Sequence, residues 1–296
     1  MSTAIAFQSV TKRYRNGTLA LQDVSWSIRE GAAVCLLGPN GAGKSTSIRL
    51  VEGALRPTRG SVELLGVAVG SRGYEAARER TGIVPQGPGM YRDLNAGEYL
   101  QLAADLYRAQ PQAAIRTFGL EEHLRVRMSE LSGGFQRRLV LAAALVSEPE
   151  VLLLDEPTVG LDPKASHEVH EHLRRVMAGR TTLLCTHNLA EAEALCEEVI
   201  ILQAGRVIVQ GRLDELRRGT RPRVRFAARQ GPEALLSALD GFGAAQIDGS
   251  DVLVEVADPK LDAPRLLRHL LDAGLDVYEC TPVLASLEDV FLEAIQ

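Results

Sequence analysis

The stretch Ala32-Ala-Val-Cys-Leu-Leu-Gly-Pro-Asn-Gly-Ala-Gly-Lys-Ser-Thr46 decides the fold class of this 296-residue chain. Residues 32–37 form a continuous apolar run, which is typical of a strand that is covered on both faces of a sheet. Residues 38–45 match the pattern G-x-x-x-x-G-K-[ST], and a helical pattern begins at about Lys44. We therefore expect a strand, a glycine-rich loop and a helix in succession, which is the start of an α/β domain.

The glycine-rich loop has the chemistry of a phosphate site. Its glycines allow consecutive backbone N–H groups to turn inward, and the start of the following helix adds partial positive charge. Lys44 can neutralise β- and γ-phosphate oxygens, and the Ser45 hydroxyl can bind Mg²⁺. The loop therefore predicts binding of a nucleoside triphosphate, through Gly38, Pro39, Asn40, Gly41, Ala42, Gly43, Lys44, Ser45 and Thr46.

Two acidic residues stand at the end of a second apolar run, at residues 151–155. Beside a complete phosphate loop, Asp155 is the expected ligand of Mg²⁺, held directly or through water. Glu156 is then placed to polarise a water molecule that attacks the γ-phosphate. The pair predicts hydrolysis of the bound nucleotide.

The remaining pattern predicts two domains. Residues 3–37 have β character, with Val24, Trp26 and Ile28 alternating with serines, and residues 93–146 are helical. Further apolar strands at 181–186 and 199–202 alternate with helices, which indicates a mostly parallel sheet. The pattern breaks at residues 219–222, so we expect a first domain over 1–218 and a small α+β domain over 223–296. Its expected elements are strands at 223–227, 245–247, 252–256 and 277–281 and helices at 232–239, 264–273 and 286–294.

Composition excludes several classes of protein. The net charge is −5 and the pI about 5.8, which argues against a general nucleic-acid binder. Aromatic residues make up only 4%, so extensive stacking surfaces for bases are not expected. Cys35, Cys185, Cys196 and Cys280 lie far apart, which is typical of reduced cysteines in the cytoplasm. No apolar run approaches the roughly 20 residues of a membrane-spanning helix, and the N-terminus has no export signal.

Together the motifs resemble those of the ATP-binding cassette (ABC) ATPases over residues 3–216, with a mostly parallel sheet, an N-terminal antiparallel β subdomain and a helical subdomain. Leu131-Ser-Gly-Gly-Phe-Gln-Arg-Arg138 is similar to the signature motif of that family. The resemblance assigns expected roles to four further residues: Tyr14 stacks on adenine, Gln86 contacts Mg²⁺ and water, Asp162 lies in a loop between subunits, and His187 contacts the γ-phosphate.

The signature motif can also be interpreted from its chemistry alone. Ser132, Gly133 and Gly134 open a helix, where exposed N–H groups and a hydroxyl make an anion site without a lysine. The resemblance implies that this surface reads ATP bound to a second copy, so that two subunits close head to tail over two ATP molecules, most simply as a homodimer. It also implies transmembrane permease subunits as partners and a place on the cytoplasmic face of the cell membrane.

Phe135 stands where many family members carry Gln, and the following Gln-Arg-Arg is similar to the drug-exporter branch. Residues 282–292 resemble the C-terminal segment of that branch, in which Ser286 and Asp289 can cap a helix. We therefore expect ATP-driven export of a drug-like or lipophilic compound. An importer subunit would share every catalytic residue, and a soluble ABC protein acting on ribosomes or DNA is the remaining alternative.

Two charged clusters have simpler readings than a binding site. His167, His170 and His172 fit an exposed helix face better than a zinc site, which needs further ligands. Arg221, Arg223 and Arg225 alternate along a strand, so they line either a solvated face or a surface that docks on acidic lipid or protein. We expect the C-terminal domain to assist dimerisation or assembly with the permease.

Overall fold

The computed structural model describes residues 2–87, 91, 93–219, 221–283 and 286–295. The chain forms two compact units, Met1–Gly211 and Arg212–Gln296. This division assigns residues 212–218 to the second unit, whereas the sequence pattern groups them with the first domain.

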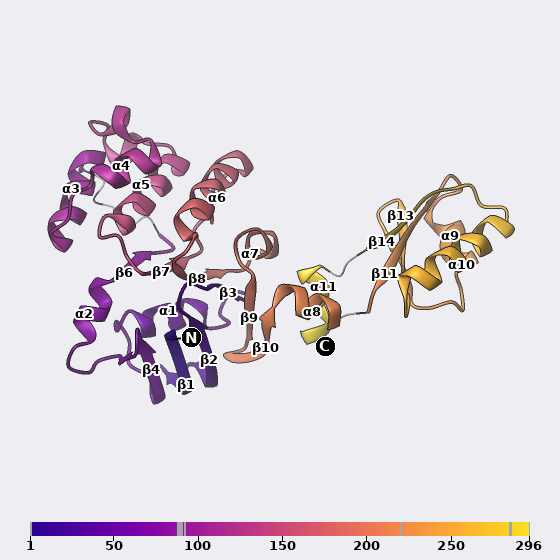
Figure 1. The fold of residues 1–296 in the computed structure, drawn as a ribbon, viewed down its shortest axis with the longest axis horizontal. Helices are drawn as coiled ribbons and strands as arrows, with labels where there is room; N and C mark the ends of the chain where they lie inside the picture. Colours follow the sequence, from indigo (N-terminus) through magenta and orange to yellow (C-terminus); the bar gives the residue numbers. More distant parts are fainter. Residues whose placement is uncertain (1, 88–90, 92, 220, 284–285, 296) are drawn as a thin grey trace. The chain divides into compact units, whose positions relative to one another are not determined.

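A six-stranded sheet forms the centre of the first unit (Figure 1). Its core pairings are all parallel, and the two apolar runs predicted as covered strands are its strands β3 and β7, which are buried almost throughout. This confirms the predicted mostly parallel sheet. The strand order is β10 (Arg206–Arg212), β9 (Glu198–Gln203), β3 (Ala33–Leu37), β8 (Thr181–Thr186), β7 (Val151–Asp155) and β6 (Thr81–Val84).

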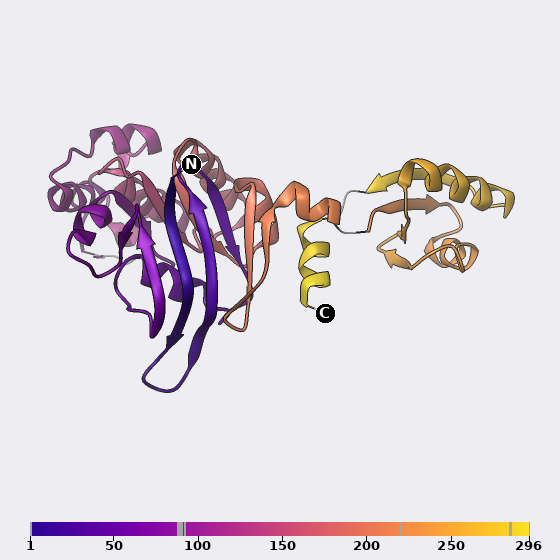
Figure 2. The same ribbon diagram turned by 60° about the horizontal axis from the view of Figure 1, so that its bottom comes forward.

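The N-terminal β region forms a separate antiparallel sheet. Val24, Trp26 and Ile28 are buried, as their alternation predicts. Trp26 pairs with Phe7 across neighbouring strands, and the two rings stack with centroids 4.0 Å apart. Figure 2 shows the two long strands that carry these residues side by side. The strand order is β2 (Leu19–Arg29), β1 (Thr3–Arg13), β4 (Arg59–Leu64) and β5 (Val67–Ala68).

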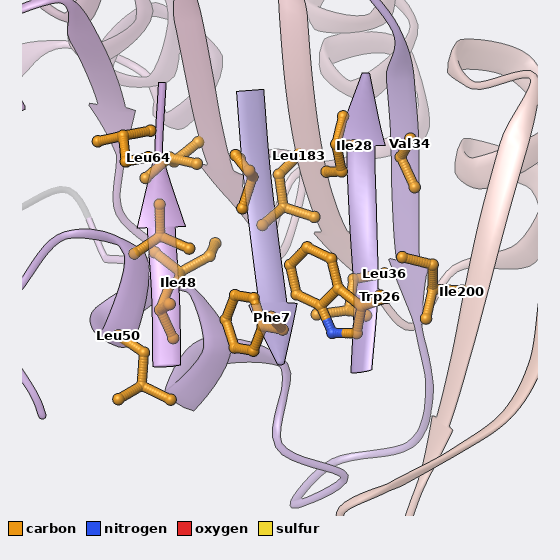
Figure 3. Close-up of a cluster of buried hydrophobic side chains, with 14 of the residues drawn as sticks. Phe7, Trp26, Ile28, Val34, Leu36, Ile48, Leu50, Leu64, Leu183 and Ile200 are labelled. Carbon is orange, nitrogen blue, oxygen red and sulfur yellow. The ribbon is translucent and has the colours of Figure 1, made fainter. Parts of the chain in front are cut away.

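One apolar cluster joins the two sheets and helix α1 (Lys44–Val51) (Figure 3). Phe7 and Trp26 reach it from the antiparallel sheet, Leu36 from β3 and Ile48 from α1. Full burial of a large apolar side chain contributes about 1.5–3 kcal/mol. The phosphate loop between β3 and α1 is therefore anchored at both ends in this core.

The helices of the first unit include the group expected over residues 93–146, which Figure 1 shows together. An Asn95–Glu98 capping box starts its first helix, whose buried residues are Ala96, Leu100 and Ala104, while Leu106 stays exposed. The group comprises α3 (Ala96–Tyr107), α4 (Gln112–Phe118), α5 (Gly133–Leu145) and the 3₁₀ turns Glu121–His123 and Met128–Glu130. The other helices are α2 (Tyr74–Glu79), α6 (Pro163–Met177) and α7 (Leu189–Leu195).

The second unit follows the predicted order of elements. Its antiparallel sheet runs β12 (Ala245–Asp248), β13 (Asp251–Glu255), β11 (Arg223–Ala228) and β14 (Val277–Val283). Helices α9 (Pro232–Ala238) and α10 (Pro259–Asp272) bury Leu235 and Leu270 in one cluster with Phe226 of β11. Helix α8 (Leu213–Gly219) contacts α11 (Leu287–Ile295), which begins with the predicted reciprocal hydrogen bonds between Ser286 and Asp289.

Helix α10 begins earlier than the sequence pattern predicts. The pattern starts the helix at Pro264, because proline favours a first turn. In the structure Asp258 caps the helix by accepting from the backbone N–H of Lys260, and Pro259 takes the first position. Pro264 then lies inside the helix. A second good start signal upstream outweighs the single backbone hydrogen bond that Pro264 forfeits.

Among the described residues, none of the helices combines the length and the apolar character needed to cross a membrane.

Candidate functional site

The phosphate loop lies between β3 and α1 and closes over the side chain of Lys44. The Nζ atom of Lys44 donates hydrogen bonds to the carbonyl oxygens of Gly38, at 2.6 Å, and Pro39, at 3.2 Å. The side chain is only 5% exposed. A buried ammonium group beside the start of a helix is a strong electrostatic attractor for phosphate.

Glycine is required at two positions of this loop. At Gly43 the φ angle is +112°, and a Cβ atom would lie 2.7 Å from the carbonyl oxygen of Ala20. At Gly38 a Cβ atom would lie 2.3 Å from the carbonyl oxygen of Leu202. Real Cβ atoms do not approach backbone oxygens so closely, so the tight loop depends on the missing side chains.

Two carboxylates at the end of β7, those of Asp155 and Glu156, meet this loop. Glu156 lies 3.3 Å from the Nζ atom of Lys44 through Oε1, and its Oε2 atom lies 2.7 Å from Nδ1 of His187. Its side chain is 6% exposed, while that of His187 is 48% exposed. Glu156 also has a φ of +49°, a left-handed backbone conformation that costs a residue with a Cβ about 1–3 kcal/mol.

Asp155 and Ser45 form the second contact between the strand end and the loop. The Ser45 hydroxyl donates to Oδ1 of Asp155 at 3.2 Å. Burial raises the pKa of Asp155, and the hydrogen bond from Ser45 opposes that rise. A hydroxyl and a carboxylate so close together supply the oxygen atoms that Mg²⁺ prefers.

A pocket of about 440 Å³ lies over the loop. The hydroxyl groups of Tyr14 and Thr46 lie 3.1 Å apart at its wall, and Gln86 reaches it from the loop after β6. The predicted residues that line it are Tyr14, Asn40, Gly41, Gly43, Lys44, Ser45, Thr46, Gln86 and Glu156. It is also lined by Thr18, Leu19 and Ala20, which no sequence motif points to. Of the other loop residues, Ala42 is buried.

The lining of this pocket does not include Gly38, Pro39, Ala42, Asp155 or His187, nor the four residues that the resemblance assigns to contacts with a second subunit. Ser132 and Asp162 cap helices instead: Ser132 Oγ accepts from the N–H of Phe135 at 3.3 Å, and Asp162 Oδ1 accepts from that of Ala165 at 2.9 Å. Gly133 and Gly134 occupy the first turn of α5, and a Cβ on Gly134 would lie 3.0 Å from Cβ of Ala165. Gly134 therefore also permits the starts of α5 and α6 to pack closely.

Sequence reasoning missed a buried polar network behind the carboxylates. Glu191 of α7 is 1% exposed and accepts from the Thr158 hydroxyl at 2.7 Å. Its Oε1 atom also lies 3.2 Å from Nε2 of His170. Burial would raise the pKa of Glu191, but hydrogen bonds from His170, Thr186 and Thr158 lower it. Because these partners lie on different elements, no local motif could reveal them.

One histidine of the first charged cluster and the arginines of the second have polar partners in the structure. His170 pairs with Glu191, and no group of three or more metal-binding side chains occurs among the described residues. In the second unit Arg223 pairs with Asp289 at 2.7 Å, and Arg225 lies 3.3 Å from Asp248. The arginine face is thus balanced by acids, which favours the reading as a solvated face over docking on acidic lipid.

Comparison with known sequences places these motifs in a family. The sequence pattern of the ABC transporter family matches residues 21–159, and that of the DrrA1-3-like ATP-binding protein C-terminal domain matches residues 211–295. Nod factor export ATP-binding protein I of Burkholderia orbicola is 38% identical over an alignment of 312 positions, which covers 99% of this chain and 97% of the relative. Its namesake from Rhizobium meliloti is 36% identical, with coverage of 98% and 88%.

Solved structures agree. An ATP-binding subunit of an ABC transporter is 34% identical with a TM-score of 0.64, covering 73% of this chain and 92% of that one. A dimeric ATP-binding cassette in a post-hydrolysis state, with bound ADP and phosphate, is 28% identical with a TM-score of 0.64 and coverage of 71% and 98%. The resemblance and the fold class expected from the motifs are thereby confirmed. The chain belongs to the ATP-binding subunits of ABC transporters, and it is an ATPase.

Proposed function

We propose that this chain hydrolyses ATP bound at the phosphate loop and uses the reaction to drive export through a membrane permease. The observation that carries the proposal is Glu156, held between Lys44 and His187 at the end of β7. A buried carboxylate beside the phosphate-binding lysine is where a base for water attack on the γ-phosphate is needed.

The pocket residues divide the work of binding. The ring of Tyr14 stacks on adenine, and the backbone N–H groups of the loop with Lys44 hold the β- and γ-phosphates. Ser45, Asp155 and Gln86 would hold Mg²⁺, which fits because all three offer oxygen atoms and Ser45 already contacts Asp155. When bound, Mg²⁺ supplies charge neutralisation of the phosphate oxygens.

In the hydrolytic step Glu156 orients a water molecule in line with the γ-phosphate and accepts its proton as the water attacks. Lys44 stabilises the negative charge on the γ-phosphate oxygens. His187, already hydrogen-bonded to Glu156, contacts the same phosphate and keeps the carboxylate aimed at the water. The products are ADP and inorganic phosphate.

Ser132, Gly133, Gly134 and Asp162 complete the site in a second subunit. They lie at helix starts outside the pocket of their own chain, so Ser132, Gly133 and Gly134 are available to the ATP of another copy, and Asp162 is available to hydrogen-bond donors of that copy. ATP would then stabilise a closed homodimer, because it contacts both surfaces only in that state. Subunits of this family work as dimers with membrane permease subunits, and closing and reopening of the dimer would move this permease.

Two observations favour export over import. The second unit matches a C-terminal domain named for DrrA-like ATP-binding proteins, and the relatives that cover the whole chain are named as export subunits. We propose a drug-like or lipophilic compound as cargo, selected by the permease. Transport in membrane vesicles that hold this chain with its permease tests the direction: outward, ATP-dependent movement supports export, and inward movement overturns it.

A mixing experiment tests the composite site. Lys44→Ala removes the phosphate-binding lysine, and Ser132→Asp places a negative charge where the other copy's γ-phosphate would lie, yet retains a good helix cap. Each variant alone should be nearly inactive in phosphate release. Mixed chains should regain activity, because a heterodimer contains one intact loop facing one intact signature. Absence of recovery in dimers shown to have exchanged subunits would refute the composite site.

A further inference from the structure

Arg137 occupies the second turn of α5, the helix whose first turn carries the signature glycines. Arginine side chains are mostly exposed in proteins, but Arg137 is only 7% exposed. Its guanidinium group donates to the carbonyl oxygens of Asp155 at 3.2 Å and Glu156 at 3.0 Å, and to that of Pro157. It thus binds the backbone on both sides of the Glu156 side chain.

The same guanidinium reaches the other loop of the site. Its Nη1 atom donates to the carbonyl oxygen of Pro85 at 2.7 Å, and Pro85 directly precedes Gln86. Burial lowers the pKa of Arg137 to about 10, against the opposing charges of Glu191 and Asp155, so the group stays protonated at neutral pH. Its planar fork of five N–H donors can serve four separate carbonyls, which a lysine ammonium cannot reproduce.

This contact bears on the strained residue of the site. Glu156 has a positive φ, and such a backbone persists only where the surroundings hold it. Hydrogen bonds from Arg137 to three consecutive carbonyls, together with the bond from the Glu156 N–H to the carbonyl oxygen of Cys185 at 2.8 Å, fix the peptide groups around it. One side chain of α5 therefore fixes the backbone from which the Glu156 side chain extends towards Lys44 and His187.

We propose that Arg137 is a positioning residue that keeps Glu156 and Gln86 in register with α5, so that movement of the signature helix changes the geometry of hydrolysis. The inference rests on the proposed function, in which Glu156 activates water. The rival reading is that Arg137 only satisfies buried carbonyls. The two readings differ in what its loss does to kcat, to nucleotide binding and to the effect of a Glu156 variant.

The test uses Arg137→Met and Arg137→Lys in the full chain. Phosphate release gives kcat and KM, a fluorescent ATP analogue gives the nucleotide Kd, and thermal unfolding reports stability. Misplacement of a catalytic group by about 1 Å can cost about 10²-fold in rate, so kcat should fall by about that factor while Kd changes little. The matched control is Arg180→Met, because Arg180 also donates to a backbone carbonyl, that of Val176 at 2.6 Å, and should retain normal kcat.

A double-variant cycle separates positioning from a purely structural role. In a Glu156→Gln chain, Arg137→Met should slow single-turnover hydrolysis little further, because the group that it positions is already disabled. An equal loss of kcat in both backgrounds would overturn the inference. If Arg137→Met fails to fold, Arg137→Lys decides: normal kcat in that variant overturns the inference, and low kcat with normal Kd supports it. Normal turnover in Glu156→Gln alone would instead refute the proposed function.

Discussion

Replacement of Glu156 by Gln is the most direct test of the hydrolytic step. The amide keeps the size of the side chain but cannot accept a proton from water. Turnover should therefore fall by about 10²–10⁴-fold, the usual contribution of a positioned base, which raises the barrier by about 2.7–5.5 kcal/mol.

The structure also predicts how Glu156→Gln changes nucleotide binding. Turnover should fall, but ATP binding should not weaken. Lys44 lies 3.3 Å from the Glu156 carboxylate, and both side chains are almost fully buried. At an effective dielectric constant of about 20 this attraction amounts to about 5 kcal/mol before desolvation is counted. Phosphate must compete with the carboxylate for Lys44. Removing the charge of Glu156 removes the competitor, so ATP should bind the variant at least as tightly as the wild type.

The assay combines phosphate release at saturating ATP and Mg²⁺ with equilibrium binding of a fluorescent ATP analogue. Glu150→Gln is the matched control, because Glu150 precedes the same strand and pairs with Arg80 on the exposed surface. It should leave both parameters unchanged. Near-normal turnover in Glu156→Gln, or a loss of turnover that merely follows a loss of binding, would refute the assignment of Glu156 as the base.

Three further results are expected. Lys44→Ala should weaken ATP binding by about 1.5–3 kcal/mol, the strength of a charge-assisted hydrogen bond, in the same binding assay. Gly43→Ala should destabilise the chain and abolish binding, whereas Gly17→Ala, with φ +90° and open space around it, should lower the melting temperature through strain alone. For Asp289, burial raises the pKa, but hydrogen bonds from Ser286 and the pairing with Arg223 outweigh this effect, so the pKa lies below its usual value. A lowered carboxyl pKa stabilises the fold above the unfolded value of about 3.9 and ceases to do so as the pH falls through the folded value. Asp289→Asn should therefore cost about 1–2 kcal/mol in urea unfolding at pH 7, and this cost should shrink as the pH falls below about 3.9. A cost that stays constant over that fall in pH would contradict this.

Local sequence patterns predicted most of the fold. The alternation of Val24, Trp26 and Ile28 and the apolar run of β7 each reflect a period that burial imposes directly, so the sequence predicts them well. The phosphate loop is equally local, because its backbone conformation depends on glycines within one short segment. The boundaries of elements were predicted less accurately. At the start of α10 two helix-start signals compete, and packing decides between them.

The supporting residues of the site could not be predicted in this way. Glu191 lies on α7, while its partners Thr158 and His170 lie on a loop and on α6. Arg137 binds carbonyl oxygens, which every residue possesses, so its role leaves no trace in the identity of its partners. Interactions with backbone atoms and between distant segments become visible only when the fold is assembled.

Ser132 and Asp162 both cap helices, but this structural role does not exhaust their hydrogen-bonding capacity. Ser132 accepts one hydrogen bond through a lone pair of Oγ, and its hydroxyl proton remains free to be donated to a phosphate oxygen. Asp162 is an acceptor only, so a second subunit must offer it a donor and not a phosphate. In the proposed closed dimer the two helix starts would therefore play unequal parts: Ser132 would bind the nucleotide itself, and Asp162 would bind the protein that surrounds it.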